Sequence, residues 1–450
     1  MPDHDRAVDA LRASYEAVPD GQPVRLAKRT TNLFRPRAAS TAGLDVSGLT
    51  GVLNVDGVSR TAEVQGMCTY ERLVDATLPH GLMPLVVPQL KTITLGGAVT
   101  GLGIESTSFR HGMPHESVLE ADVFTGAGEL VTATPDGPHA DLFAALPNSL
   151  GSLGYTTRLR IELQPIEPYI CLRNLRFHDV DALLAAIAEV AATGLWDGEA
   201  VDAMDAVMFA IDDLVLVLAR FSGEKGPTSN YTGQAIFYKS LREKQTDRLT
   251  AVQYLWRWDT DWFWVSRAFG AQHPVLRRLW PARYRRSDVY HRMMSFEQRH
   301  GWWARLERRR GRPERERVVQ DVELPVARTG EFLRWFARRV GMSPVWLCPI
   351  RVRGARSWPL FPLEPGVTYV NAGFWGTVPI APGANDGEVN RAVEDKVEVL
   401  DGHKTLYSDA YYSRETFDRL YGGDVYRKAK QRYDPDNRLT GLYEKVVLSR

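Results

Sequence analysis

Apolar and polar residues alternate in short runs through the first third of the chain, which predicts strands and turns with few helices. A helix is expected over residues 5–17, because Ala7, Leu11 and Tyr15 recur at helical spacing. A second is expected from Tyr70 to Gly81, where glycine ends it. Five runs have a strand-like pattern: 51–55, 62–65, 85–87, 117–125 and 130–134. Because strands and helices follow no regular strand–helix–strand repeat, we expect an α+β fold.

Two prolines, Pro165 and Pro168, mark the expected domain boundary. A chain of 450 residues exceeds what one hydrophobic core usually serves. We therefore expect domains at 1–168 and 169–395, with a C-terminal segment at 396–450. Beyond the prolines the pattern predicts a strand at 170–177, a helix at 181–192, an apolar stretch at 207–221, strands at 348–352 and 367–375, and a helix at 414–433.

Composition is that of an ordinary globular protein, with 44% apolar residues and a net charge of +1. The three cysteines, Cys68, Cys171 and Cys348, are far apart and odd in number, so we interpret them as buried thiols rather than a disulfide framework or a zinc site. The N-terminal residues show no basic segment followed by an apolar stretch. We therefore expect neither a signal peptide nor a membrane anchor, and a cytoplasmic protein.

The even charge balance hides one lopsided segment. Residues 257–317 contain 16 Arg, no Lys and 7 acidic residues, and seven of the twelve tryptophans lie between Trp256 and Trp303. Arginine mixed with large aromatic residues suits lipid headgroups at a membrane surface. The alternative is a solvated helical face with aromatic core contacts. Nucleic acid is disfavoured because no recognisable binding motif accompanies the charge.

The stretch from Leu95 to Gly112 places five glycines beside a cluster of small hydroxyl residues. Glycine has no Cβ, so backbone N–H groups there can approach a ligand, and successive N–H groups in a turn bind anions. This predicts a phosphorylated cofactor; the alternative is a tight glycine-rich hairpin without a ligand.

Several other sites are excluded by spacing. The glycine order and the polar residues after it do not match a Rossmann loop, and no Walker A pattern occurs. His111 and His115 have metal-ligand spacing, but Gly112 and Pro114 make a helix there unfavourable, so we expect no metal. No Gly-x-Ser-x-Gly elbow is present for a serine nucleophile.

Several blocks together resemble the FAD-binding domain of the vanillyl-alcohol-oxidase (PCMH-type) flavoprotein superfamily. The Gly-Ile-Glu-Ser block at 103–106 resembles, more narrowly, the delta-24 sterol side-chain reductases and their bacterial relatives. The resemblance covers roughly residues 25–168 and 345–447 and is weak between them. The blocks that carry it are 87–90, 94–97, 101–108, 151–155, 370–375, 402–409, 434–435 and 442–445.

The resemblance implies a two-subdomain PCMH-type FAD-binding domain, with an α+β cap domain over the flavin ring. It places the first cofactor loop at Thr30, Thr31 and Asn32, where the family's oxidases are usually glycine-rich. No histidine stands in this loop, so non-covalent FAD is expected. The other residues that the resemblance assigns to FAD are Gly96, Gly97, Gly101, Gly103, Ile104, Ser106, Ser108, Ser117, Val118, Gly151, Gly154 and Ile161.

The reductase branch acts on isolated carbon–carbon double bonds in lipids, which implies a general acid beside an apolar cavity. Protonation of the alkene gives a tertiary carbocation that hydride then quenches, and water must be kept from that cation. The candidate acids are Glu105, His403, Lys404, Tyr407 and Asp409. We favour the group from His403 to Tyr407.

Among bacterial relatives, the implied substrate is a methylene-branched fatty-acyl chain reduced to its methyl form; a sterol-like side chain is the other option. NADPH is the expected electron donor, and pairing with a lipid methyltransferase and a peripheral position at the inner face of the membrane are further expectations. Two alternatives remain open: an FAD-dependent oxidase or dehydrogenase of a sugar, alditol or hydroxy acid, and a protein that binds flavin or lipid without turnover.

Overall fold

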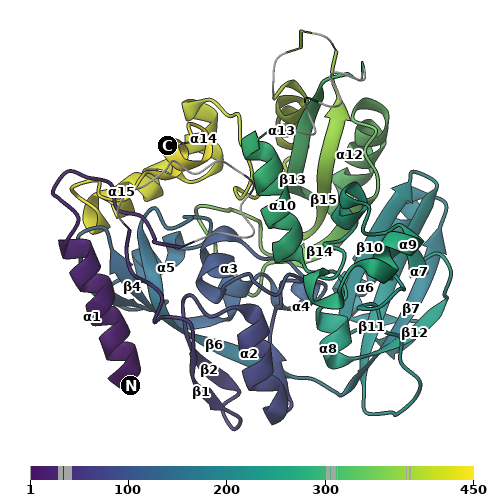
Figure 1. The fold of residues 1–450 in the computed structure, drawn as a ribbon, viewed down its shortest axis with the longest axis horizontal. Coiled ribbons are helices and arrows are strands. Elements are labelled where there is room, and N and C mark those ends of the chain that lie inside the picture. Colours follow the sequence, from purple (N-terminus) through teal and green to yellow (C-terminus); the bar gives the residue numbers. More distant parts are fainter. Residues whose placement is uncertain are drawn as a thin grey trace.

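Two antiparallel sheets form the framework of the fold, one at the lower left and the other on the right of Figure 1. The structure is a computed structural model that describes residues 2–28, 34, 43–300, 305, 311, 313–381, 383–384 and 387–449. Both sheets are combined with helices, so the predicted α+β class is confirmed. The last strand of the first sheet ends at Pro165, and the first strand of the second begins at Tyr169.

Residues 2–165, which we call the N-terminal half of the fold, are built on a six-stranded sheet in the order β1-β2-β6-β4-β5. Strand β3 pairs with the C-terminal end of β6. Leu159, Ile161 and Leu163 of β6 are buried because alternate strand residues face the core. The elements are α1 (Pro2–Glu16), β1 (Val52–Asp56), β2 (Thr61–Gln65), α2 (Tyr70–Thr77), η1 (Leu78–His80), β3 (Leu82–Pro84), α3 (Leu95–Gly101), α4 (Ser108–His111), η2 (Pro114–Ser117), β4 (Val118–Thr125), β5 (Leu130–Ala133), α5 (Ala140–Ala145) and β6 (Gly154–Pro165).

The second half forms an eight-stranded cap sheet in the order β12-β7-β11-β10-β14-β15-β13-β16. The elements are β7 (Tyr169–Phe177), α6 (Val180–Thr193), β8 (Leu195–Trp196), β9 (Glu199–Ala200), β10 (Ala203–Ala210), β11 (Asp213–Ser222), α7 (Phe237–Ser240), β12 (Thr246–Thr250), α8 (Ala251–Leu255), η3 (Val265–Phe269), α9 (Pro274–Leu279), η4 (Ala282–Tyr284), α10 (Ser287–His300), β13 (Arg315–Pro325), α12 (Val326–Arg339), β14 (Val345–Arg351), β15 (Thr368–Pro379), α13 (Glu388–Val399) and β16 (His403–Lys404).

The two faces of the cap sheet belong to different cores. Leu347 and Phe374 belong to one apolar cluster with helices α6, α12 and α13. Trp346 and Cys348 point the other way and join the core of the N-terminal half. Since neighbouring strand residues alternate between faces, one face of the cap sheet is left to close over the N-terminal half.

The C-terminal segment returns to the N-terminal half after pairing with the cap through β16. It contains α14 (Arg414–Leu420), α15 (Gly423–Tyr433) and α16 (Leu442–Val446). The Lys430 ammonium donates to the Ser152 carbonyl at 3.0 Å, and the Tyr433 hydroxyl donates to Asp141 at 2.7 Å. The sequence predicted one helix over 414–433; the structure has two, because Gly422 adopts a left-handed conformation with φ 60°.

Two further differences affect the site. A strand was predicted at 85–87, but β3 ends at Pro84 and residues 85–87 form irregular structure. The glycine run, for which the sequence indicated a turn or a hairpin, begins with the short helix α3. Glycine lowers helix propensity, but a helix can still form where close packing against a neighbouring backbone leaves no room for a Cβ.

Candidate functional site

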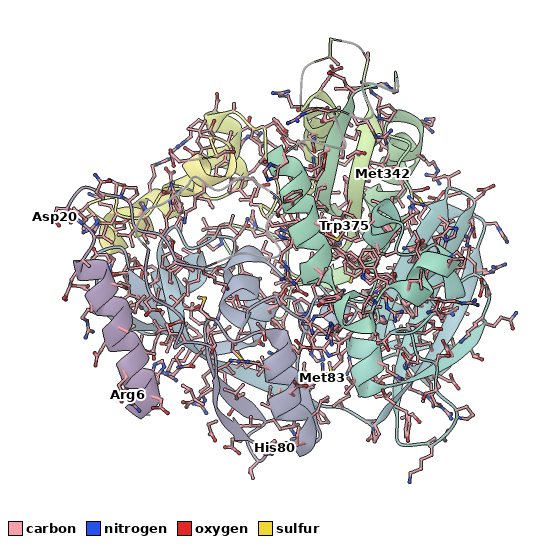
Figure 2. All side chains as sticks on the ribbon, in the orientation of Figure 1. Arg6, Asp20, His80, Met83, Met342 and Trp375 are labelled. Carbon is pink, nitrogen blue, oxygen red and sulfur yellow. The ribbon has the colours of Figure 1, made fainter. Side chains whose placement is uncertain are left out.

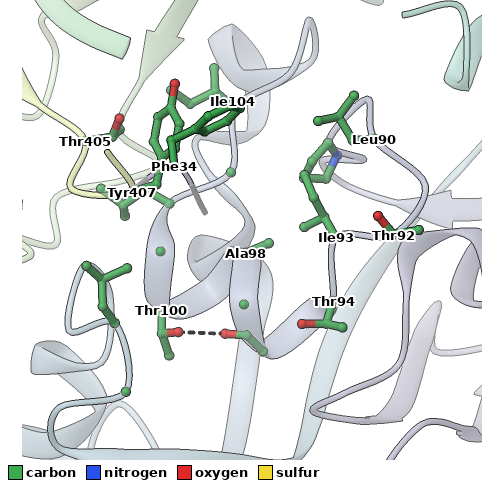
Figure 3. A pocket seen from close by; sticks show the side chains of 18 of the residues that line it. Phe34, Leu90, Thr92, Ile93, Thr94, Ala98, Thr100, Ile104, Thr405 and Tyr407 are labelled. Carbon is green, nitrogen blue, oxygen red and sulfur yellow. Dashed lines mark hydrogen bonds between the residues drawn. The ribbon is translucent and has the colours of Figure 1, made fainter. Parts of the chain in front are cut away.

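A cavity of about 340 Å³ lies between α3 of the N-terminal half and the inner face of the cap sheet. Its size is that of a small-molecule site. Figure 3 shows Phe34, Ile104, Thr405 and Tyr407 gathered at one end of it. Residues from β6, β13, β14, β15 and the segment at 405–407 all reach the cavity, so it exists only when both halves and the C-terminal segment are assembled.

One end of the cavity is basic and lined by small residues. Arg25, Lys28 and Lys445 belong to the lining, together with the glycines of α3. The Lys28 ammonium donates to the Thr94 hydroxyl at 3.1 Å, beside the start of α3. The Lys445 ammonium donates to the Gly151 carbonyl at 2.9 Å. Cations and exposed backbone close together suit the phosphates of a nucleotide cofactor.

The other end is aromatic. Phe263 lies 4.5 Å from Trp375 between ring centroids, and Phe34 stacks on Trp262 at 5.4 Å. Trp346 adds a further indole to the wall. Trp375 lies in the densely packed middle of the molecule, between the two halves (Figure 2). This wall can enclose a flat ring or an apolar chain and keep water away from it.

A hydrogen-bonded acid pair interrupts the aromatic wall. The Tyr407 hydroxyl accepts a bond from the Trp375 indole at 2.8 Å and is bonded to the Asp321 carboxyl. Asn371 also donates to Asp321, at 3.1 Å. Burial raises the pKa of Asp321 to about 6, although its two hydrogen bonds act in the opposite direction. The pair can therefore hold an exchangeable proton near neutral pH.

A second carboxyl, Glu323, lies two residues from Asp321 along β13 and on the same face of the strand. It is fully buried, and neither carboxyl oxygen has a hydrogen-bond partner among the described residues. Burial, and then the nearby Asp321 charge, raise the pKa of Glu323 well above its ordinary value. Burial therefore favours the protonated form of Glu323.

Of the other proposed acids, none lines the cavity. His403 pairs across the sheet with Glu323, its ring 5.7 Å from that of Phe361, and burial lowers its pKa to about 4. Lys404 points to the opposite face, where its ammonium lies 2.6 Å from Glu394. Asp409 is paired with Arg317. Strand alternation thus sends Lys404 away from the cavity, while Thr405 and Tyr407 line it.

Glu105 lies behind the cavity, in a buried ionic cluster that joins the two halves. The Arg257 guanidinium lies 3.0 Å from Glu105 and 3.1 Å from Asp205 of β10. Tyr254 bonds Ser106 at 2.9 Å in the same cluster. Burial raises the pKa of Glu105, although Arg257 opposes the shift. Glu105 is thus placed to position the loop that carries Ile104, and not to face a ligand.

The residues predicted to bind the cofactor divide into three groups. Those that line the cavity are Gly96, Gly97, Gly101, Gly103, Ile104, Gly151 and Gly154. Those that are buried but do not line the cavity are Ser106, Ser108, Ser117, Val118 and Ile161. Those that lie outside the described residues are Thr30, Thr31 and Asn32.

Other cavity residues escaped the sequence analysis. Asp321 and Trp346 come from segments that carry no recognisable local motif. Trp375 and Lys445 lie in the blocks 370–375 and 442–445 that carry the resemblance, but no role was predicted for either side chain. Two acidic residues, Asp321 and Glu323, in the valine-rich run at 318–324 were the available signal for Asp321.

Comparison with known proteins bears on what this cavity holds. Residues 3–134 match the family described as "FAD binding domain". The protein is an FAD-dependent oxidoreductase with a PCMH-type domain. Relatives called Delta(24)-sterol reductase, from Homo sapiens and Arabidopsis thaliana, are 24% and 23% identical over 430 and 449 residues. Each match covers 76% of the relative, and 88% and 89% of this chain respectively. Cytokinin dehydrogenase 7 of Oryza sativa subsp. japonica is 37% identical over 131 residues, which are 29% of this chain and 25% of that protein.

The cavity of this flavoprotein fits FAD in chemistry as well as in place. Gly97 is exposed on α3, next to Lys28 and Arg25, where a diphosphate can meet cations and backbone together. The aromatic end can take the flavin ring. The glycines and cations would hold the diphosphate of FAD, and the aromatic side chains around Tyr407 would hold its ring.

Substituting Gly96 by alanine is expected to lower FAD content and thermal stability together. A Cβ there would lie 2.4 Å from the Thr156 hydroxyl and 2.7 Å from the Gly66 carbonyl, so α3 must move off the sheet. Overpacking of this kind costs about 1–3 kcal/mol. Flavin absorbance per protein and the melting temperature measure the effect. Gly57→Ala is the control, since nothing lies within 4 Å of a Cβ there; equal FAD content in both variants would contradict the assignment.

Proposed function

We propose that this flavoprotein reduces an isolated carbon–carbon double bond in a lipid, most specifically a methylene-branched fatty-acyl chain, with a sterol-like side chain as the alternative substrate. The relatives named Delta(24)-sterol reductase, alignable over most of the chain, support the reaction class. The observation that carries the proposal is the combination of an aromatic wall with one acid pair at its surface.

In this proposal the Tyr407 hydroxyl gives the proton to the alkene, and Asp321 replaces it. An unactivated alkene is a poor hydride acceptor, so protonation must come first or accompany hydride transfer. The Trp375 N–H bond to the Tyr407 oxygen stabilises negative charge that develops there. Asp321 is hydrogen-bonded to the same hydroxyl and can pass its own proton forward.

The aromatic wall protects the electron-deficient carbon formed by protonation. Trp262, Phe263 and Trp375 present indole and phenyl groups to the cavity, and their π faces attract positive charge. The same side chains exclude water, which would otherwise trap the cation as an alcohol. Bound reduced FAD supplies the hydride that completes the reduction.

We further propose NADPH as the electron donor, used in alternation with the lipid. A lipid methyltransferase that makes the methylene branch is the proposed functional partner. Anaerobic mixing of NADPH with the oxidised flavoprotein tests the donor. Loss of the yellow flavin absorbance supports NADPH. If dithionite removes this absorbance and NADPH does not, NADPH is not the donor.

Reoxidation of the reduced flavin tests the reaction itself. The purified protein is photoreduced anaerobically, and then a detergent-dispersed methylene-branched lipid, a lipid with a sterol-like alkene side chain, or the saturated form of each is added. We expect flavin absorbance to return only with an alkene, and the saturated product to appear by mass spectrometry. If neither alkene reoxidises the flavin, while a sugar, alditol or hydroxy acid reduces the oxidised enzyme, the protein is an oxidase or dehydrogenase instead.

A further inference from the structure

The segment rich in arginine and aromatic residues splits into a buried and an exposed part. Trp256, Trp258, Trp262 and Trp264 are each at most 5% exposed and belong to the core around the cavity. Arg257 is buried with them in the ionic cluster. This part of the segment therefore follows the core interpretation, and its tryptophans are unavailable to a membrane.

The exposed part is an apolar surface on α9, η4 and α10, which we call the α9–α10 surface. Leu279 is 75% exposed and Val275 57%, both on α9. Tyr284 of η4 and Met293 and Phe296 of α10 are also large exposed side chains. Isolated exposed apolar residues are ordinary, but so many within 22 residues mark an interaction site.

This surface is strongly basic. Of the seven Arg in residues 265–296, Arg277 and Arg285 are buried and the other five are at least partly exposed; the segment has no Lys and a single acidic residue, Asp288. Arg267, Arg278 and Arg283 are exposed among the apolar side chains. The Arg283 guanidinium stacks on the Tyr284 ring at 4.8 Å, which gives an amphipathic pair with an apolar body and a charged tip.

The α9–α10 surface adjoins the aromatic end of the cavity. His291 of α10 faces inward, its ring 6.0 Å from both Phe34 and Trp262, which line the cavity. Phe269, at the end of η3, stacks on Tyr290 of α10 at 5.7 Å. Figure 1 shows α9 and α10 on the same side of the cap sheet. One continuous packing unit thus joins the exposed apolar residues to the proposed lipid site.

We propose that the α9–α10 surface docks on an anionic lipid bilayer, so that a lipid chain can pass from the bilayer into the aromatic end of the cavity. The inference rests on the proposed lipid substrate. Arginines that meet negatively charged headgroups, with leucine, valine and phenylalanine entering the acyl boundary, are what an interfacial helix requires. None of the described helices is both long and apolar enough to cross a bilayer, so the contact is peripheral.

Co-sedimentation with vesicles tests the docking. The holoprotein is mixed at low salt with phosphatidylglycerol-containing vesicles or with pure phosphatidylcholine vesicles. We expect binding to the anionic vesicles, loss of most of it at high salt, and little binding to phosphatidylcholine. The double variant Val275→Glu/Leu279→Glu and the double variant Arg278→Glu/Arg283→Glu are each expected to weaken binding by about tenfold or more.

Val58→Glu is the matched control, because Val58 is 96% exposed in the turn between β1 and β2, far from α9 in the chain. It should bind as the unchanged protein does. Both double variants should keep full FAD content and full reoxidation with detergent-dispersed lipid, while reoxidation by lipid embedded in vesicles falls. The proposal is overturned if the unchanged protein does not bind anionic vesicles at low salt, or if both double variants bind them as well as the unchanged protein does. If detergent-dispersed lipid does not reoxidise the flavin of the unchanged protein, the proposed function is rejected instead.

Discussion

Tyr407→Phe is expected to slow lipid-dependent reoxidation of the reduced flavin by about 10²–10⁴-fold while FAD stays bound. The substitution removes the hydroxyl that links Trp375 to Asp321 and keeps the ring that packs against Phe34 at 5.7 Å. Single-turnover reoxidation with a methylene-branched lipid measures the effect. Tyr443→Phe is the control, since its hydroxyl bonds the Tyr412 carbonyl away from the cavity. Equal rates in the two variants would remove Tyr407 from the mechanism.

The same mechanism sets the direction of the pH dependence. Burial raises the pKa of Asp321 to about 6, and the relay requires the protonated form. The single-turnover rate should therefore be level below pH 6 and fall about tenfold for each pH unit above it, as the protonated fraction declines. Asp321→Asn should lower the rate and abolish this dependence. A rate that rises with pH across the same interval would contradict the proton relay.

Arg257→Met is expected to cause the largest loss of stability of any single substitution considered for this protein. It removes the cation shared by Glu105 and Asp205 and leaves two carboxyls buried without it. Breaking a buried pair in this way typically costs roughly 3–5 kcal/mol. Because the cluster joins the loop at 103–106 to β10 of the cap, FAD content should fall as well. Thermal unfolding and flavin absorbance measure the two effects.

Neutralising the orphaned carboxyls provides the internal check. The triple variant Arg257→Met/Glu105→Gln/Asp205→Asn should regain much of the lost melting temperature, because no unpaired charge stays buried. Arg292→Met is the surface control: Arg292 is 62% exposed and pairs with Asp288, so little change is expected. A triple variant as unstable as Arg257→Met would show that side-chain packing, rather than charge, holds this junction.

Local pattern was sufficient for most of the secondary structure. Helices α1, α2 and α6 and strands β1, β2, β4, β5 and β7 fall within a few residues of their expected positions, because side-chain periodicity and terminal glycines act over a few residues. The glycine run was harder. Its residues argue against a helix locally, but at Gly96 only a residue without a Cβ lets α3 lie against Gly66 and Thr156.

The cofactor and the superfamily could be predicted from the sequence alone, because the glycines of the 95–112 run lie close together in the chain and their order can be compared with known motifs. The sequence also singled out Tyr407. The partners of Tyr407 became clear only from the fold. Asp321 and Trp375 come from the cap strands β13 and β15, and nothing in the sequence relates either residue to Tyr407. The fold likewise turned Lys404 toward Glu394 and separated buried from exposed arginines. Which face of a strand is buried, and what each side chain contacts, depend on partners far apart in the chain, so a local sequence pattern cannot predict them.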